Sequence, residues 1–358
     1  MNCPSTIEEA IEFVRGAKQI IPAGVGTKRP KTDSPDILDL SDFTGIIEYE
    51  PSEYTFSARA GTTIAEINEA LKINGQYLPF DPPFVDAGAT LGGTIASGLS
   101  GPGRLRYGGI RDFLIGIRIL NGEGVVIQGG GKVVKNAAGY DYPKLFCGAM
   151  GTLGILLETT FKVFPSPRAT RTLELSLDSK KAAIETLCII ARSQWEPDAL
   201  EFFPEHNKLL LRLAGNADAL DARLPKILQE LSYCDAKELP EGEATDQWHA
   251  LQEFDWAPRD AHILKAPITP KDIPELDQAL SSNTVTRHYG MAGNVAWIAI
   301  TENQALEKIS TLLEDQGIAA GTVRGNMERF AYGKTRSQKI HKAVKGALDP
   351  LGKFPFFQ

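Results

Sequence analysis

The 358-residue sequence predicts an α+β protein of two domains, and two contrasts along the chain support this prediction. Eighteen of the 34 glycines lie between Gly88 and Gly154, in loops that abut strand-like segments. After the prolines at positions 165 and 167, glycine becomes rare and helical segments alternate with short strands, as in an antiparallel sheet covered by helices on one face. The proline pair is the expected boundary, with a first domain over 1–167, a second over 168–335, and a C-terminal helix and tail over 336–358.

The composition is that of an ordinary globular protein, with 42% hydrophobic and 23% charged residues. A net charge of −7 argues against a nucleic-acid-binding protein, because neutralising phosphates requires clustered lysine and arginine. No apolar run is long enough to span a membrane, and the N-terminus lacks the pattern of a signal peptide. The cysteines are too scattered for a disulfide framework or an iron–sulfur motif, and no two histidines have metal-binding spacing. We therefore expect a cytoplasmic protein without a metal site.

The first domain is expected to open with a helix and to continue as short strands. Ser5 and Thr6 stand at capping-box spacing from Glu8 and Glu9, and the apolar residues that follow recur at helical spacing up to Gly16. A second helix is expected after a cap at Thr62 or Thr63, with Gly75 as its C-terminal glycine. Strands are expected over 19–21, 37–40, 46–50 and 54–60.

The segment from Gly88 to Gly108 is the most unusual part of the sequence. Between 87 and 103 it contains six glycines and no charged residue. Because glycine is costly inside regular elements, we expect neither a helix nor a strand throughout, but backbone that turns closely against a ligand. Further on, Asn121-Gly122 predicts a hairpin between strands over 113–120 and 125–128. A short helix is then expected from Asp141, and a long strand over 155–164.

The second domain is expected to alternate between the two kinds of element. Helical periodicity marks 180–193, 219–231 and 302–315, and strand-like segments cover 172–177, 200–204, 208–213, 261–265 and 295–299. A basic helix is expected over 336–348. The aromatic tail over 354–357 must be buried on this chain or on another one.

Three glycine-containing loops have the character of an anion site. Residues Pro22 to Lys28 form a Gly-x-Gly-Thr turn after a strand, in which freed backbone N–H groups can make a nest and Thr27 can add a hydroxyl donor. An ordinary turn is the alternative. The loop is not a Rossmann fingerprint, since GxGxxG and the ribose-binding acid are missing, and it lacks the GK[ST] ending of a P-loop.

The second loop, 88–101, offers Thr90, Thr94, Ser97 and Ser100 as hydroxyl donors, with Arg104, Arg106 and Tyr107 following at its mouth. Packing of a small-residue helix on a sheet is the alternative, which explains the glycines but not the uncharged hydroxyls. The third loop, 148–155, again leads from glycines into a strand. Three separate loops suit a large phosphorylated cofactor, whereas a mononucleotide needs only one. The pattern therefore favours a dinucleotide and, without a Rossmann unit, a non-Rossmann FAD site.

The ordered segments IPAGVGTK, ATLGGTIASGLSGPGRLRYG and VVKNAAGYDYPKLFCGAMGTLGILLETTFKVFP resemble the FAD-binding domain of the vanillyl-alcohol-oxidase, or PCMH, type of flavoprotein. Within that superfamily, residues 7–167 are most similar to the FAD-binding subunits of glycolate oxidases (glycolate dehydrogenases). The ending ALDPLGKF also resembles that family, but Phe354-Pro355-Phe356 replaces its usual Asn-Pro-Gly.

This resemblance implies a two-lobed FAD-binding domain with a smaller cap domain over the flavin ring. It implies a pyrophosphate site at Pro22, Ala23, Gly24, Val25, Gly26, Thr27 and Lys28, and contacts along the phosphates and ribityl chain from Gly88, Ala89, Thr90, Gly92, Gly93, Ser97 and Gly98. Gly154 and Ile155 would offer backbone groups to the adenine or the flavin. Some members attach the flavin to a histidine of the first or second loop. Neither loop has one here, so we expect FAD to be bound non-covalently.

Substrate oxidation would need further groups in the second domain. A 2-hydroxy acid calls for an arginine that binds the carboxylate and a base that accepts the hydroxyl proton. The candidates lie in no recognisable motif, and a solvated cation or a satisfied histidine is the alternative for each. They are Arg259, His262, Lys265, Arg287, His288, Tyr289 and Arg324. Of these, Arg287, His288 and Arg324 are kept as the candidate catalytic residues.

The resemblance therefore implies an accessory flavin subunit of a heteromer. It would work with a catalytic flavin subunit and an iron–sulfur subunit in the oxidation of glycolate to glyoxylate, passing electrons to a partner. Such a complex would be cytoplasmic, with peripheral attachment to the inner membrane face through partners as a further option. Two alternatives stay open: a self-sufficient FAD-dependent 2-hydroxy-acid dehydrogenase, and a non-catalytic scaffold of the same fold.

Overall fold

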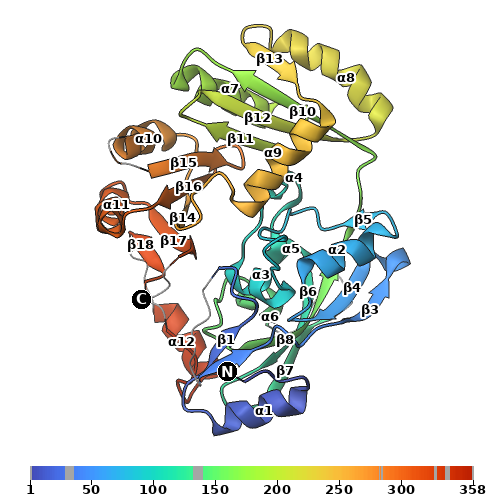
Figure 1. The fold of residues 1–358 in the computed structure, drawn as a ribbon, viewed down its shortest axis with the longest axis vertical. Helices are drawn as coiled ribbons and strands as arrows, with labels where there is room; N and C mark the ends of the chain where they lie inside the picture. Colours follow the sequence, from blue (N-terminus) through green and yellow to red (C-terminus); the bar gives the residue numbers. More distant parts are fainter. Residues whose placement is uncertain are drawn as a thin grey trace. The chain divides into compact units, whose positions relative to one another are not determined.

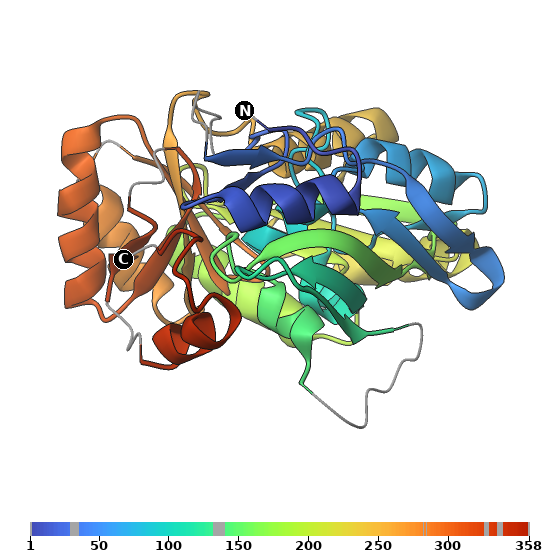
Figure 2. The same cartoon turned by 90° about the horizontal axis from the view of Figure 1, so that it is seen from below.

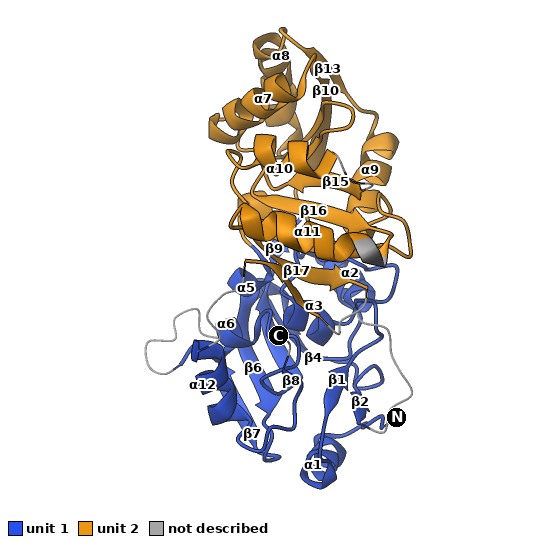
Figure 3. Cartoon of the chain, turned by 90° about the vertical axis from the view of Figure 1, so that its left-hand side faces the viewer, with its two compact units in different colours: residues 1–100, 109–166, 337–358 blue, residues 101–108, 167–336 orange. Residues whose placement is uncertain are grey.

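The computed structural model describes residues 2–28, 36–131, 140–281, 283, 285–325, 329–334 and 339–356. They divide into two compact units, which Figure 3 colours separately. Unit 1 comprises residues 1–100, 109–166 and 337–358, and unit 2 comprises 101–108 and 167–336. The segment 101–108, which we expected in the first domain, thus packs with unit 2, and the C-terminal segment packs with unit 1.

Unit 1 is centred on an antiparallel sheet of five strands. Helices accompany this sheet, which confirms the predicted α+β class. The strands in spatial order are β3 (Ile46–Glu50), β4 (Thr55–Arg59), β8 (Ile155–Lys162), β6 (Leu114–Leu120) and β7 (Val126–Gly130). The predicted hairpin is confirmed as β6–β7. The side-chain oxygen of Asn121 accepts hydrogen bonds from the backbone N–H groups of Glu123 at 3.0 Å and Val125 at 2.8 Å, which fixes the turn.

A second layer of unit 1 joins α1 (Ile7–Gly16) to a parallel pair, β1 (Ile21–Ala23) and β2 (Ile37–Asp39). Thr6 and Glu9 form the predicted capping box at the start of α1. Ala10 and Val14 on the inner face of this helix pack with Ile20 and Leu38 in one buried cluster. In Figure 2 the helix is the dark blue one near the middle of the view.

The glycine-rich segment is neither a helix nor a strand throughout, as expected, but part of it forms a helix, α3 (Leu91–Ser97). The Thr90 hydroxyl caps it by accepting the N–H of Gly93 at 3.2 Å. Gly98 ends the helix at φ +63°. A Cβ on Gly92 would lie 2.8 Å from the Cβ of Ala60, so close packing on the sheet requires glycine at that helical position. The alternative of a small-residue helix packed on a sheet was correct for this position.

The remaining elements of unit 1 are short or C-terminal. The helix α2 is capped by Thr63 and ends before Gly75, which has a φ of +62°. The predicted segment 132–139 and the start of the C-terminal helix before 339 lie outside the described residues. The bounds are η1 (Pro51–Glu53), α2 (Ile64–Lys72), β5 (Gln76–Tyr77), α5 (Ile110–Phe113), α6 (Tyr142–Phe146), β9 (Phe164–Pro165) and α12 (Lys339–Leu348).

Unit 2 is built on an antiparallel sheet of nine strands (Figure 1). In spatial order these are β13 (Asp235–Glu238), β10 (Ala169–Ser176), β12 (Lys208–Gly215), β11 (Ala199–Phe203), β15 (Val285–Gly290), β16 (Val295–Ile300), β14 (His262–Pro267), β17 (Ala319–Arg324) and β18 (Ala331–Gly333). Four of them, β13, β15, β17 and β18, were not predicted. Polar residues interrupt β15 and hide its strand pattern, although the side chains of Arg287 and His288 are buried in the fold.

The helices of unit 2 lie mainly on one face of this sheet, as predicted. Apolar residues of α7, α8, α10 and α11 share one core cluster with the strands. Two of the helices, α10 and α9, were not predicted. Trp248 and Leu251 of α9 pack with Leu210 in a separate cluster. The bounds are α4 (Arg104–Tyr107), α7 (Lys180–Arg192), α8 (Ala217–Glu230), α9 (Glu241–Glu253), α10 (Ile273–Ser281) and α11 (Asn303–Asp315). No described helix has the length and apolar character needed to cross a membrane.

Candidate cofactor pocket

Unit 1 contains a pocket at the place where two of the glycine-containing loops meet α3. Its empty space, counted together with the part that is open to solvent, amounts to about 1120 Å³. The walls are the loop from Ile21 to Lys28, one side of α3, and the loop from Phe146 to Gly154. Ala60 and Leu156, from the end of β4 and from β8, close the apolar back.

The first loop presents a row of backbone donors. Among the described residues, no acceptor receives the N–H groups of Gly24, Val25, Gly26 or Thr27. Gly26 has a φ of +93°, a conformation that glycine adopts without strain. A Cβ on Gly24 would lie 2.5 Å from the Thr90 hydroxyl oxygen, so the loop can approach α3 this closely only with glycine there. These donors are available to an anion.

The electrostatics of the described lining also favour an anion. Lys28 is the one charged side chain in it, and no carboxylate is present. The Lys28 side chain is buried at 7% exposure, with its ammonium 3.3 Å from the Thr27 hydroxyl and 5.3 Å from the centre of the Phe84 ring. The buried lysine and the open N–H groups lie at the same end of the pocket, where N–H donors suit an anion.

The hydroxyl groups of α3 serve the fold more than was expected. Thr94 donates to the Thr90 carbonyl at 2.9 Å, and Ser97 donates to the Thr94 carbonyl at 3.0 Å. Ser100 accepts the N–H of Ile110 at 3.0 Å. The N–H groups of Leu91, Gly92 and Gly93 are also bonded within the protein. These three N–H groups are therefore not open donors like those of the first loop, and the second backbone nest stays a prediction.

The third loop is tied to the end of α3. Gly148 and Met150 donate their N–H groups to the carbonyls of Ile95 at 2.9 Å and Ala96 at 2.8 Å. Gly151 has a φ of +73°, and a Cβ on it would approach the Pro22 ring to 3.4 Å. The first and third loops are thus in contact across the pocket, although more than 120 residues separate them in the sequence.

The structure gathers most of the predicted cofactor residues in this pocket. Those that line it are Pro22, Ala23, Gly24, Val25, Gly26, Thr27, Lys28, Thr90, Gly92, Gly93, Ser97 and Gly154. Gly88, Ala89, Gly98 and Ile155 adjoin the lining without belonging to it, and Tyr107 belongs to unit 2. Ala149, Met150 and Gly151 belong to the predicted third loop and also line the pocket, although they were not named as cofactor-binding residues. Ala96 and Phe146 line it without having been predicted to do so.

Substitutions of Thr90 test its role as the cap of α3. Replacing it with alanine removes the cap of Gly93 and is expected to cost about 1 kcal/mol of folding free energy. Thr90→Ser keeps the hydroxyl and should be close to wild type. The two variants are compared by urea unfolding followed by circular dichroism. Equal stability of the alanine and serine variants would contradict the capping role.

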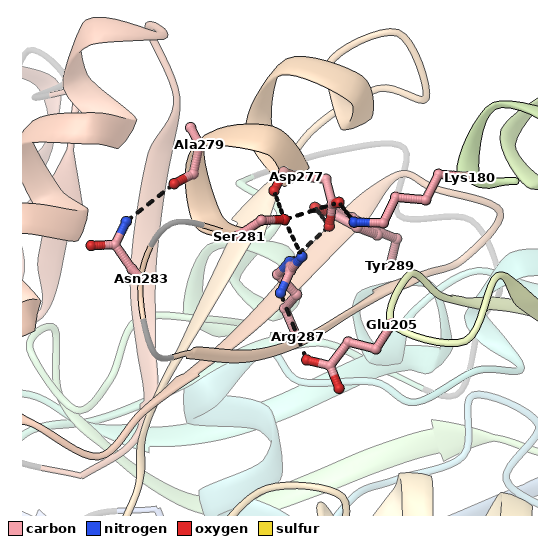
Figure 4. Close-up of polar contacts among 8 residues, drawn as sticks. All are labelled: Lys180, Glu205, Asp277, Ala279, Ser281, Asn283, Arg287 and Tyr289. Atoms are coloured by element: carbon pink, nitrogen blue, oxygen red, sulfur yellow. Dashed lines mark hydrogen bonds and ion pairs between the residues drawn. The ribbon is translucent and has the colours of Figure 1, made fainter.

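In unit 2, Arg287 belongs to a buried polar network (Figure 4). Its Nε donates to Asp277 at 2.7 Å and its Nη2 to the Ser281 hydroxyl at 2.7 Å. The Tyr289 hydroxyl donates to the same Asp277 oxygen at 3.1 Å, and the Lys180 ammonium lies 2.6 Å from the other one. Burial alone would raise the pKa of Asp277, but hydrogen bonds from Arg287 and Lys180 outweigh burial and hold that pKa below its ordinary value. These contacts give Arg287 a structural role, and its binding of a substrate carboxylate stays a prediction.

The other retained candidates lie apart from Arg287. His288 follows Arg287 on β15 and therefore points to the opposite face of the sheet. Its Nε2 lies 3.3 Å from Glu201, and within the described part of the chain its buried Nδ1 has no hydrogen-bond partner. Arg324 is on β17, separated from β15 by two strands, and donates to the Pro258 carbonyl at 2.6 Å. Desolvation lowers the pKa of Arg324. These three residues do not form one site.

The chain is similar to known proteins along most of its length. Residues 2–130 match a family model described as an FAD binding domain. Glycolate oxidase subunit GlcE of Escherichia coli strain K12 is 33% identical over 88% of this chain and 85% of its own length. The chain belongs to the family of FAD-binding glycolate oxidase subunits. A second member, subunit GlcD of Bacillus subtilis strain 168, is 31% identical over 54% of this chain and 42% of its own length.

Solved structures of other proteins have the same fold. An alkyldihydroxyacetonephosphate synthase superposes with a TM-score of 0.72 over 98% of this chain and 75% of its own, at 17% identity. A p-cresol methylhydroxylase reaches 0.73 over 98% of this chain and 87% of its own, at 14% identity. The glycolate oxidase subunit family is a family of FAD-dependent oxidoreductases, and the pocket residues of unit 1 suit its cofactor. Open N–H groups and a buried lysine fit the phosphates, and an apolar back fits flat rings.

Proposed function

We propose that this chain is the FAD-binding subunit of a glycolate oxidase complex and that FAD occupies the pocket of unit 1. The observation that carries the proposal is the row of open N–H groups from Gly24 to Thr27, beside buried Lys28, in a chain 33% identical to a glycolate oxidase subunit. FAD would supply a two-electron acceptor for the oxidation of a CH–OH group. The chain's own residues would hold its phosphates and exclude water from its rings.

The first loop would bind the pyrophosphate through backbone groups, with Lys28 neutralising part of its charge. Thr90, Gly92 and Gly93 would form the opposite wall, and Gly154 would offer backbone at the far end. The described lining contains no histidine, cysteine or tyrosine that could form a bond to the cofactor. This composition supports non-covalent binding.

The chain would act as the accessory flavin subunit. Arg287 is held in the network of Asp277, and the described candidates of unit 2 form no joint site for a 2-hydroxy acid. A catalytic flavin subunit would then contact glycolate, and an iron–sulfur subunit would carry electrons onward, with glyoxylate as the product. The four cysteines of this chain are far apart in the sequence and form no iron–sulfur motif, which is in keeping with a cluster on a partner.

The test uses the purified chain, its absorbance spectrum and its partners. We expect a yellow protein whose FAD is released intact by acid denaturation. Glycolate alone should leave the flavin absorbance unchanged, and adding the partner subunits should allow glycolate to bleach it. Bleaching by glycolate without partners would instead support a self-sufficient 2-hydroxy-acid dehydrogenase. A chain that takes up no FAD would overturn the proposal and favour a scaffold.

A further inference from the structure

The C-terminal segment is hydrogen-bonded to backbone that lies behind the lining of the cofactor pocket. The Lys345 ammonium on α12 donates to the carbonyls of Thr152 at 2.9 Å and Phe354 at 3.0 Å, and lies 2.9 Å from the Asp349 carboxylate. All three hydrogens of the ammonium are used in this way. The Lys345 side chain is 12% exposed, and that of Asp349 is fully buried. Lys345 and Asp349 therefore form a buried ion pair within unit 1.

One side of the contact reaches the third loop. Thr152 is buried behind the pocket, and its hydroxyl donates to the Ala149 carbonyl at 2.6 Å. Ala149, Met150 and Gly151 are lining residues. The hydrogen bond from Lys345 to the Thr152 carbonyl therefore fixes the rear of the loop whose front faces the cofactor.

The other side of the contact reaches the first loop. The two carboxylate oxygens of Asp349 accept the N–H groups of Lys353 and Phe354, each at 2.9 Å. The Lys353 carbonyl in turn accepts the N–H of Ile20 at 2.8 Å, immediately before β1. β1 leads directly into the row of open donors. Phe354 also packs in the same buried cluster as Leu40, which lines the pocket.

We propose that Lys345 is a positioning residue for FAD, which sets the distance between the first and third loops through Thr152 and Asp349. Lys345 is not a lining residue and does not itself contact the cofactor space. The inference rests on the proposed function, since it needs FAD in this pocket. It adds a role for the C-terminal helix in the affinity for the cofactor.

The test replaces Lys345 with methionine, which keeps the length of the side chain and removes its three donors. We expect the dissociation constant for FAD, titrated into apoprotein, to rise about tenfold or more. Looser loops should also make the bound flavin more accessible to iodide and change its visible circular dichroism. Lys342→Met on the same helix is the matched control. Its ammonium is exposed and lies 5.8 Å from the centre of the Phe356 ring, so FAD binding should stay within about twofold of wild type.

A second control separates positioning from general stability. Tyr289→Phe removes one buried hydrogen bond in unit 2 and should lower the melting temperature without changing the affinity for FAD. An equal loss of affinity in Tyr289→Phe and Lys345→Met would overturn the positioning role, as would unchanged affinity in Lys345→Met. If the methionine variant does not fold, Lys345→Arg takes its place, with about threefold weaker binding expected because the guanidinium cannot reproduce the three bonds. Unchanged binding in that variant would overturn the role. Failure of the wild type to bind FAD would instead overturn the proposed function.

Discussion

Gly93→Glu should abolish FAD retention while leaving the fold intact. Gly93 lines the pocket and is the third residue of α3, three positions after the capping Thr90. A glutamate there completes a Thr-x-x-Glu capping box and places a negative charge in the first turn, both of which favour the helix. The same carboxylate faces a pocket proposed to hold a pyrophosphate. Since like charges in close contact cost several kcal/mol, we expect the affinity for FAD to fall about a hundredfold or more.

The measurement is a fluorescence titration of apoprotein with FAD, together with thermal unfolding of the apoprotein. Gly93→Ala is the matched control because it carries the same Cβ, which would lie 3.1 Å from the Thr90 hydroxyl oxygen, without the charge. Gly16→Glu places a carboxylate at the exposed end of α1, away from the pocket. Both controls should retain FAD. Equal affinity of Gly93→Glu and Gly93→Ala would mean that the phosphates lie elsewhere.

Asp277→Asn should destabilise unit 2 by about 3–5 kcal/mol. Asp277 and Arg287 are 3% and 7% exposed, so the substitution removes the buried anionic partner of a buried guanidinium. The half-exposed Glu205, 3.7 Å away, is the anion that stays beside it. The amide also loses the charge that attracts Lys180. Replacing Asp221, which pairs with Arg171 at the surface, should cost less than about 1 kcal/mol and serves as the matched control. A loss for Asp277→Asn no larger than for Asp221→Asn would contradict the network in Figure 4.

The network also predicts a dependence of stability on pH. The pKa of Asp277 is lowered in the folded protein, so its ionised form is favoured by folding. Its contribution is therefore complete above the pKa of the unfolded chain, about 4, and is lost as the pH falls through the lower folded pKa. Urea unfolding measured between neutral pH and the acid range should show this loss in the wild type and not in Asp277→Asn. All four tryptophans, Trp195, Trp248, Trp256 and Trp297, belong to unit 2, so intrinsic fluorescence reports on the relevant unit.

Local patterns in the sequence were sufficient for part of the fold and of the pocket. The capping box at Thr6 and the turn at Asn121 are local signals, and both elements formed as predicted. The first loop could also be identified, because Gly24, Gly26, Thr27 and Lys28 all lie within five residues of the sequence. The helix α3 was considered only as an alternative, since glycines are poor helix formers and Gly92 is required by the close approach of Ala60, a tertiary contact.

The contacts that hold the sites together involve residues far apart in the chain. Lys180 and Asp277 are separated by 97 positions, and Thr152 and Lys345 by 193. Nothing in either local sequence marks one of these residues as the partner of the other. Arg287 is an example. In the sequence it stands in a polar segment that was not predicted as a strand, so it was a candidate for binding substrate. In the fold it is buried and bonded to Asp277, which gives it a structural role.

The placement of residues 101–108 in unit 2 constrains how such chains can be recombined. Arg106 donates to the Ala214 carbonyl at 3.2 Å and pairs with Glu196, so this short insertion is part of the second unit. Unit 1 in turn needs 337–358 to complete its core. A chimaera that exchanged only residues 167–336 with a relative would carry a mismatched insertion between α3 and α5. Transplanting the second unit therefore requires two cassettes, 101–108 and 167–336, and a simple fusion at one junction would divide both cores.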